Sequence, residues 1–277
     1  MSRGASGCWT IGDRPDRREA RPDAPRPRPT RGVRARASIL ALAAAALWQP
    51  ASPTGDRLLR AFPWAPGTKV VVESTVGDVV VAAWDRADVE VRAERRLEPG
   101  AEGRPELRAV EQPHAILVDV RQAADRADRR ARTTTHVQVP AAAPVTIRLL
   151  DGVLRLAGLR GEVAADVRQG RIEAEHIGGI VRLETGFGDV VVRGAELSPN
   201  GLLRLRAFNG SVRLGLARAP ADARILALSF NGDIRSDIPL ALRRSFGPRF
   251  GEATLGRGEP VISIDTITGD IEIRVGR

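Results

Sequence analysis

The sequence of 277 residues lacks several residue classes, and each absence removes a class of site. It has one cysteine, Cys8, so the chain can form neither an internal disulfide framework nor a metal site made of several thiolates. It has no tyrosine, and aromatic residues make up only 4% of the chain. The three histidines, His114, His136 and His176, show neither HxH nor HExxH spacing. A GxSxG turn, a P-loop and a dinucleotide-binding glycine motif are also missing, so we expect no catalytic, cofactor-binding or metal-binding residues and no cofactor.

Lysine is almost absent as well, since Lys69 is the only lysine among 43 basic residues. The net charge of +9 is unevenly distributed. Residues 1–55 hold ten arginines and four acidic residues, a balance of +6, which leaves 33 basic and 30 acidic residues, a balance of +3, for the rest. A nucleic-acid-binding body would carry a clear basic excess of its own. We therefore expect no nucleic-acid partner.

The first 55 residues differ in composition from the rest. Residues 1–36 are rich in Pro, Arg and Asp and have no hydrophobic period, which predicts a disordered leader. Residues 37–48, ASILALAAAALW, form an apolar run that is too short to span a bilayer comfortably, which takes about 20 residues, but matches the central region of a signal peptide. We expect residues 37–55 to be a signal-like or anchoring segment with a short apolar helix, and the protein to be exported or membrane-anchored, with membrane association through residues 37–48. A buried helix is the alternative.

From residue 58 onward the sequence changes to short alternating runs. Residues 229–237, SFNGDIRSD, nearly repeat AFNGSVRLG, which lies 22 residues upstream. In each copy a glycine is followed two positions later by an apolar residue, and four positions later by Leu214 in the first copy and Ser236 in the second. Such alternation predicts a strand with one buried face, and the glycine supplies a turn conformation with positive φ.

The same template recurs through residues 58–277 at intervals of 9 or 13 residues. A repeat of 18 to 22 residues predicts an all-β single-stranded β-helix, or β-solenoid, of about seven short-strand coils, each stacked on the coil before it. Two segments, about residues 85–140 and 239–259, interrupt the repeat as insertions. The predicted structural turn glycines are Gly77, Gly152, Gly161, Gly170, Gly179, Gly188, Gly201, Gly210, Gly232 and Gly269.

Three stretches carry a resemblance to a known family: residues 70–96, residues 137–192 and residues 256–276. In order and spacing they resemble the bacterial "putative adhesin" family of domains of unknown function, which are built from single-stranded β-helix-like repeats. The resemblance covers roughly residues 66–277. It implies a β-solenoid, usually behind a membrane anchor or signal, with no established catalytic residues.

Aspartates that follow turn glycines, namely Asp78, Asp189, Asp233 and Asp270, raise the alternative of a calcium-binding β-roll. Such rolls need Gly and Asp in every nonapeptide. Here residues such as Arg171 also take the position after the glycine, so we expect ordinary turn aspartates.

A carbohydrate-active β-helix enzyme is a second alternative, because it needs two carboxylates about 5 to 10 Å apart. Asp189 and Asp233 occupy equivalent turn positions two coils apart, with Ser211 between them, so they could form a stacked acidic edge. Aromatic platforms for sugars are scarce. We expect the three phenylalanines near these turns to pack inside the fold: Phe187, Phe208 and Phe230.

Outward positions carry many arginines, but Glu173, Glu175 and Glu184 interleave with them, which favours a solvated face. The arginines are Arg155, Arg171, Arg182, Arg204, Arg213 and Arg235. Taken together, the sequence predicts a non-catalytic, exported cell-envelope or surface module, adhesin-like, whose partner is an envelope protein or a polysaccharide. The alternatives are a self-assembling envelope scaffold of the bactofilin type and the carbohydrate-active enzyme. The sequence leaves the oligomeric state open.

Overall fold

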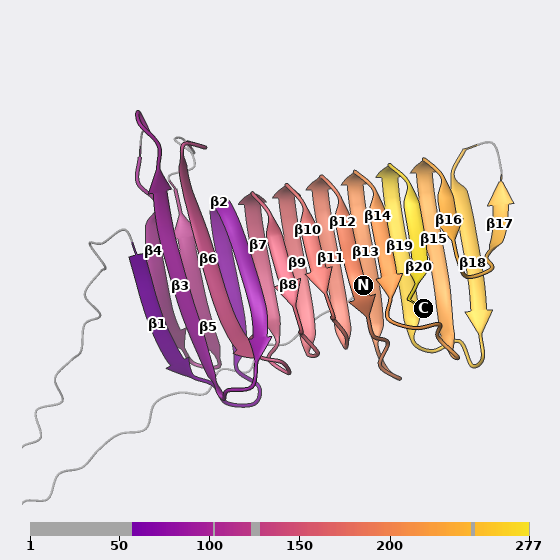
Figure 1. The fold of residues 1–277 in the computed structure, drawn as a ribbon, viewed down its shortest axis with the longest axis horizontal. Helices are drawn as coiled ribbons and strands as arrows, with labels where there is room; N and C mark the ends of the chain where they lie inside the picture. The colour runs from indigo at the N-terminus through magenta and orange to yellow at the C-terminus, as the bar shows by residue number, and fades with distance from the viewer. Residues whose placement is uncertain (1–56, 102, 123–127, 245–246, 277) are drawn as a thin grey trace, which may run out of the picture. The chain divides into compact units, whose positions relative to one another are not determined.

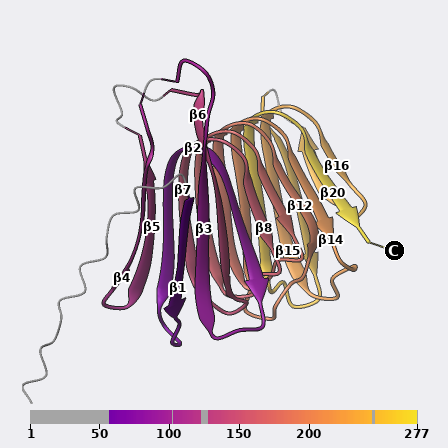
Figure 2. The ribbon, with the colours of Figure 1, turned by 60° about the vertical axis from the view of Figure 1, so that its left-hand side comes forward.

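The computed structural model describes residues 57–276 apart from 102, 123–127 and 245–246. All of these belong to one compact unit, Pro50–Arg277. The predicted leader, the predicted apolar helix and Cys8 lie outside the described residues. The described part is all-β, with twenty strands that hydrogen-bond into a continuous sheet folded into two facing layers (Figures 1 and 2). It contains no helix with the length and apolarity needed to cross a lipid bilayer.

The two layers, here called A and B, each consist mainly of parallel strands. In spatial order, layer A contains β1 (Arg57–Pro63), β3 (Asp88–Leu97), β6 (Ala131–Pro140), the second half of β2 (Lys69–Trp84), β8 (Leu154–Ala157), β10 (Ile172–Glu175), β12 (Val190–Ala195), β14 (Val212–Leu216), β20 (Ile271–Val275) and β16 (Ile234–Ser236). Layer B contains β4 (Glu106–Gln112), β5 (Ala115–Arg121), the first half of β2, β7 (Val145–Asp151), β9 (Glu162–Gln169), β11 (Ile180–Phe187), β13 (Leu202–Asn209), β19 (Val261–Thr268), β15 (Ala223–Asn231), β18 (Arg249–Leu255) and β17 (Ala241–Arg244).

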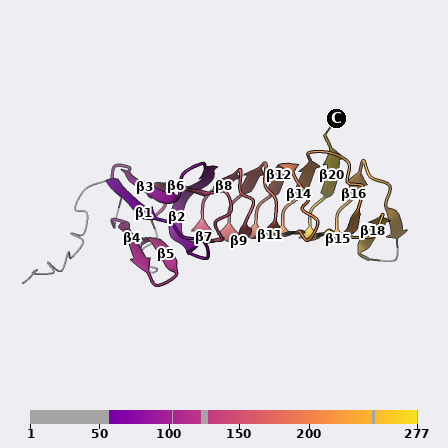
Figure 3. The same cartoon turned by 90° about the horizontal axis from the view of Figure 1, so that it is seen from below.

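Alternating side chains explain why these segments form strands. In β11, Val181 and Leu183 are buried between the layers, whereas Arg182 is exposed on the outer face. The parallel register places Val163 of β9 and Leu203 of β13 on either side of Val181, so each strand extends the same core. Fully burying one such side chain stabilises the fold by about 1.5–3 kcal/mol. The core is therefore a continuous apolar layer of side chains between A and B. Figure 3 shows the strands of the two layers edge-on.

The order of the strand pairs departs from the prediction at both ends. From β7 to β14 the pairs stack in sequence order, but β2 lies between the β5–β6 pair and the β7–β8 pair. Likewise, β19 and β20 lie between the β13–β14 pair and the β15–β16 pair (Figure 1). The prediction that every coil stacks on the one before it is therefore wrong. All pairs present the same apolar pattern, so this pattern does not distinguish one stacking order from another.

Antiparallel strands flank the parallel region. On the N-terminal side, β3 and β1 extend layer A and β4 extends layer B; on the C-terminal side, β18 and β17 extend layer B. These strands come from the two predicted insertions and from β1. The first insertion also supplies β5 and β6, so the described residues contain eight strand pairs, one more than the seven predicted.

Candidate functional site

The predicted turn glycines occupy two corners of the fold. Gly161, Gly179 and Gly201 lie where the chain passes from layer A to layer B, and a Cβ on Gly179 would lie 2.3 Å from the Arg160 carbonyl oxygen. The other seven form a column where the chain passes from layer B to layer A. In spatial order they are Gly77, Gly152, Gly170, Gly188, Gly210, Gly269 and Gly232.

In this column each glycine lies against the carbonyl of its neighbour. A Cβ on Gly170 would lie 1.7 Å from the Gly152 carbonyl oxygen, and one on Gly188 would lie 2.1 Å from that of Gly170. Most of these glycines also have positive φ, for example 143° at Gly170. Both the close backbone approach and the backbone angle require glycine here.

The aspartates that follow the corner glycines bond to neighbouring backbone. Asp189 Oδ1 accepts a hydrogen bond from the Ser211 backbone N–H at 2.9 Å. Asp270 Oδ1 accepts one from the Asp233 N–H at 2.8 Å. Asp78 Oδ1 accepts one from the Val153 N–H at 3.2 Å. These carboxylates therefore tie successive turns together.

The predicted acidic edge has a different spacing from the one expected. Because β20 lies between β14 and β16, both Ser211 and Asp270 separate Asp189 from Asp233. Three strand spacings amount to about 14 Å between the two backbones, which is more than a glycosidase carboxylate pair requires. Asp233 also forms ion pairs with Arg235 and Arg249. The two-coil spacing in the prediction is wrong, because it assumed stacking in sequence order.

The three histidines do not gather into one site, and two of them lie at turns. His114 and His176 have positive φ, 64° and 52° respectively, and His136 lies within β6. Across the described ranges, no three His, Cys, Asp or Glu side chains gather in a way that could hold a metal ion.

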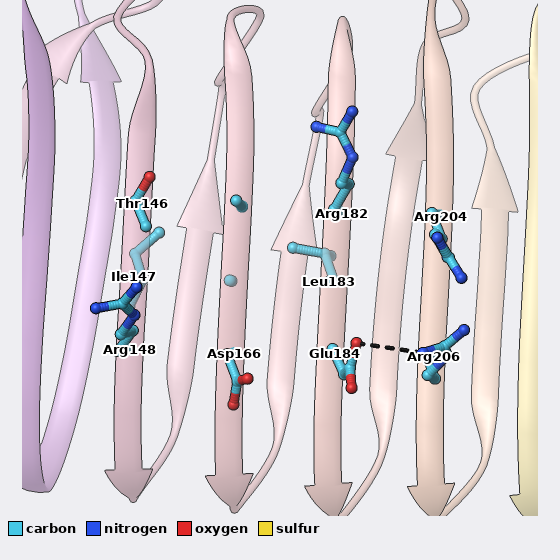
Figure 4. Close-up of a pocket in the computed structure, with 11 residues that line it drawn as sticks. Thr146, Ile147, Arg148, Asp166, Arg182, Leu183, Glu184, Arg204 and Arg206 are labelled. Carbon is cyan, nitrogen blue, oxygen red and sulfur yellow. Dashed lines mark ion pairs between the residues drawn. The ribbon is translucent and has the colours of Figure 1, made fainter. Parts of the chain in front are cut away.

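An open groove of about 310 Å³ crosses the outer face of layer B over β7, β9, β11 and β13 (Figure 4). Ala164 on β9 has a small side chain and lies between its cross-strand partners, Thr146 on β7 and Arg182 on β11, which leaves space for the groove. The charged residues that line it are Arg148, Asp166, Arg182, Glu184, Arg204 and Arg206.

Most charges around this groove are neutralised within the face. The ion pairs are Arg148–Glu73 at 3.0 Å, Arg182–Glu162 at 2.9 Å, Arg206–Glu184 at 3.7 Å and Arg206–Asp265 at 3.7 Å. Within the described part of the chain, Arg204 and Asp166 form no ion pair. This result agrees with the predicted interleaving of arginines and carboxylates on a solvated face.

Farther along the same face, Asp119 on β5 is a partly buried carboxylate. Its side chain is 14% exposed and lies 2.7 Å from the Arg121 Nε. Burial raises the pKa of the Asp119 carboxyl above its ordinary value, although the neighbouring Arg121 acts in the opposite direction.

The phenylalanines near the corner do not pack inside. Phe187 is 60% exposed, Phe230 is 54% exposed, and Phe208 is half-buried on the outer face, so the prediction that they pack in the interior is wrong. Phe208 and Phe230 stand two positions before a corner glycine, where strand alternation points a side chain outward. Phe187 stands one position before Gly188, where the chain already turns. The distance to the corner glycine is the sequence signal that would have identified these exposed rings.

Comparisons with known proteins give distant structural likenesses. No family model and no curated protein matches the chain. A putative cell adhesion protein from Clostridium sporogenes is 12% identical, with 79% of this chain and 98% of that chain covered and a TM-score of 0.48. Putative adhesins from Bacteroides fragilis and Parabacteroides distasonis are 9% and 13% identical, with 80% and 79% of this chain and 98% of each of theirs covered and TM-scores of 0.30 and 0.27. These likenesses are too distant to assign a ligand or an activity to this chain.

Proposed function

We propose that this protein is an exported β-solenoid that acts as a non-catalytic interaction module of the cell envelope. The observation that carries the proposal is the outer face of layer B, a long surface of parallel strands that carries an open groove. Such a face suits many shallow contacts with a large partner.

The solenoid description is supported by register and repeat length. Between β7 and β14, corresponding residues of neighbouring strand pairs lie 18 or 22 positions apart in the sequence and side by side in space, as Val163, Val181 and Leu203 do. No single pair has a core of its own, so each pair is stabilised by its neighbours.

Export is supported by the sequence around residues 37–48, where an apolar run follows Arg34 and Arg36. The bactofilin-like scaffold is less well supported. Such a scaffold would extend by stacking the terminal coils of separate copies, and antiparallel strands occupy both sides of the N-terminal end and layer B of the C-terminal end.

A second candidate is the carbohydrate-active enzyme, because one carboxylate pair in the groove has suitable spacing. Asp166 and Glu184 are in register on neighbouring strands, about 5 Å apart at the backbone. Glu184 is committed to an ion pair with Arg206, which weighs against a catalytic role.

Fractionation of the native host tests the location of the protein. We expect the full-length protein in the envelope or outside the cell, and a purely cytosolic pool would contradict export.

Glycan-release assays on envelope polysaccharides test the non-catalytic assignment. We expect no release, whereas release that is lost in both Asp166→Asn and Glu184→Gln would establish the enzyme instead.

A further inference from the structure

A row of outward positions crosses layer B two residues before the corner glycines. The paired residues on either side place these positions next to one another on β7, β9, β11, β13, β19 and β15. We call this row the track. Its members are Leu150, Arg168, Gly186, Phe208, Ile267 and Phe230.

One half of the track is apolar; Ile267 and Phe230 are exposed, and Phe208 is half-buried. Ile267 is 48% exposed and stands between Phe208 and Phe230 on neighbouring strands. Leu228, on the same strand as Phe230, is also exposed. Single exposed apolar residues need no explanation, but a contiguous group of them marks a contact surface.

The other half of the track carries a positive charge without a partner. Arg168 is exposed, and no ion pair or hydrogen bond of its side chain occurs within the described ranges. Gly186 separates it from Phe208, so no side chain stands between the guanidinium and the ring on this row. The track contains no carboxylate, whereas the neighbouring row carries Asp166, Glu184 and Asp265.

We propose that the track binds a carboxylated polysaccharide that runs across the strands, with about one sugar residue per strand. This inference rests on the proposed function and names the partner class. Strands are spaced by about 4.8 Å, which is close to the length of one sugar residue in an extended chain. Pyranose rings would lay their apolar faces on Phe208, Ile267 and Phe230. A sugar carboxylate would accept a bidentate hydrogen-bonded pair from Arg168.

A membrane surface fits the same residues less well. A bilayer is planar, so it would also cover the carboxylates of the neighbouring row, Glu184 and Asp265, and remove them from water. The anionic lipids that attract arginine would repel those carboxylates. A linear chain can follow the track alone.

The test measures binding of the full-length protein to polygalacturonate, with its methyl ester as an uncharged counterpart. We expect Arg168→Ala to weaken binding to polygalacturonate about tenfold, the loss associated with one charge-assisted bidentate contact. We expect Ile267→Ser and Phe230→Ser to weaken binding to both polymers. The side chains of these variants point outward, so their unfolding midpoints should stay close to that of the wild type.

Two matched variants control for loss of charge and loss of apolar surface elsewhere. Arg218→Ala removes an exposed arginine that, within the described residues, also lacks an ion pair. Leu59→Ser removes an apolar side chain that is 58% exposed on β1 in layer A. Both should bind polygalacturonate within about twofold of the wild type, a difference of less than about 0.5 kcal/mol.

The inference would be overturned by equal effects of Arg168→Ala and Arg218→Ala, by equal binding of polygalacturonate and its methyl ester by the wild type, or by binding to phosphatidylglycerol vesicles without binding to either polymer. The last result would make the track a membrane contact. An envelope protein that binds neither polymer would contradict this inference alone, whereas a cytosolic protein that binds polygalacturonate through the track would contradict only the proposed location.

Discussion

Gly170 shows how little room the corner column leaves. Its missing side chain allows the Gly152 carbonyl to approach to a distance at which no Cβ could fit, and the contact is between backbone atoms on both sides. Backbone atoms cannot rotate away as a flexible side chain can. A methyl group added to a glycine of the column can therefore be accommodated only if the neighbouring strand pair shifts.

Gly170→Ala is expected to lower the free energy of unfolding by about 3 kcal/mol or more, because it adds a backbone clash to an unfavourable φ. Gly67→Ala is the matched control. Gly67 has a φ of 91° but no atom within 4 Å of an added Cβ, so the cost should be about 1–2 kcal/mol. Urea unfolding of both variants measures the difference, and equal costs would show that crowding at the column is unimportant.

His176 stands at a position where the neighbouring strand pairs have glycine. The backbone N–H of His176 donates to the Arg193 carbonyl, just as the backbone N–H of Gly158 donates to the Glu175 carbonyl one strand pair earlier. The equivalent residues Gly158 and Gly194 have φ values of 72° and 62°. His176→Gly should therefore raise the free energy of unfolding by about 0.5 kcal/mol, since relief of the left-handed strain exceeds the added chain entropy. Thermal unfolding measures this change. A loss of stability would mean that the imidazole, which lies over Gly194, makes a contact worth more than the strain.

Asp119 should make stability depend on pH in the direction opposite to most aspartates. Because burial raises its pKa in the folded protein, the unfolded chain releases this proton first as the pH rises from the ordinary value of 3.8. Its contribution to the free energy of unfolding therefore falls with rising pH until the folded carboxyl has also ionised. Asp119→Asn should flatten this fall in urea titrations carried out from pH 3.8 upward. A steeper fall in the variant would show that the ion pair with Arg121 outweighs burial.

At the scale of elements, the alternation of apolar residues was sufficient to predict strands and their buried faces. The template places Val163, Val181 and Leu203 two positions after a turn glycine, on the face expected to be buried, and they are buried side by side. The order of the strand pairs could not be predicted, because Ile262 fits next to Leu203 as well as Ile225 would. The track was open to prediction from its constant distance to the glycines. The lack of a partner for Arg168 was not, because a partner depends on which strand lies alongside.

The pair β19–β20 should be indispensable, although it was predicted to lie at the end of the stack. Its inward isoleucines, Ile262, Ile264, Ile271 and Ile273, are fully buried, and at about 2 kcal/mol each they contribute about 8 kcal/mol, comparable with the entire stability of a domain.

Truncation after Pro260 should therefore abolish cooperative urea unfolding and expose residues 217–260 to protease. Removal of residues 1–63, which takes away only the edge strand β1 from the described unit, should leave a cooperative transition. If the chain truncated after Pro260 unfolds like the wild type, β19 and β20 do not lie between the β13–β14 and β15–β16 pairs.

At the scale of the whole molecule, the flanking antiparallel strands limit self-association. Sedimentation of the full-length protein over a range of concentrations should show monomers or small oligomers, because a second copy cannot continue the parallel stack past β3, β4 or β18. Filaments that grow with concentration would favour the scaffold alternative.

The place of β19 and β20 also governs when the molecule can be completed. During synthesis from the N-terminus, β15 and β16 emerge before the strands that must come between them and β13 and β14. Until residue 275 has emerged, the β15–β16 pair therefore either stays apart from the β13–β14 pair, or packs against it wrongly and has to separate again. A chain that ends before β19 leaves β13, β14, β15 and β16 each without one neighbouring strand, and proteases and chaperones can distinguish such exposed edges from the finished protein.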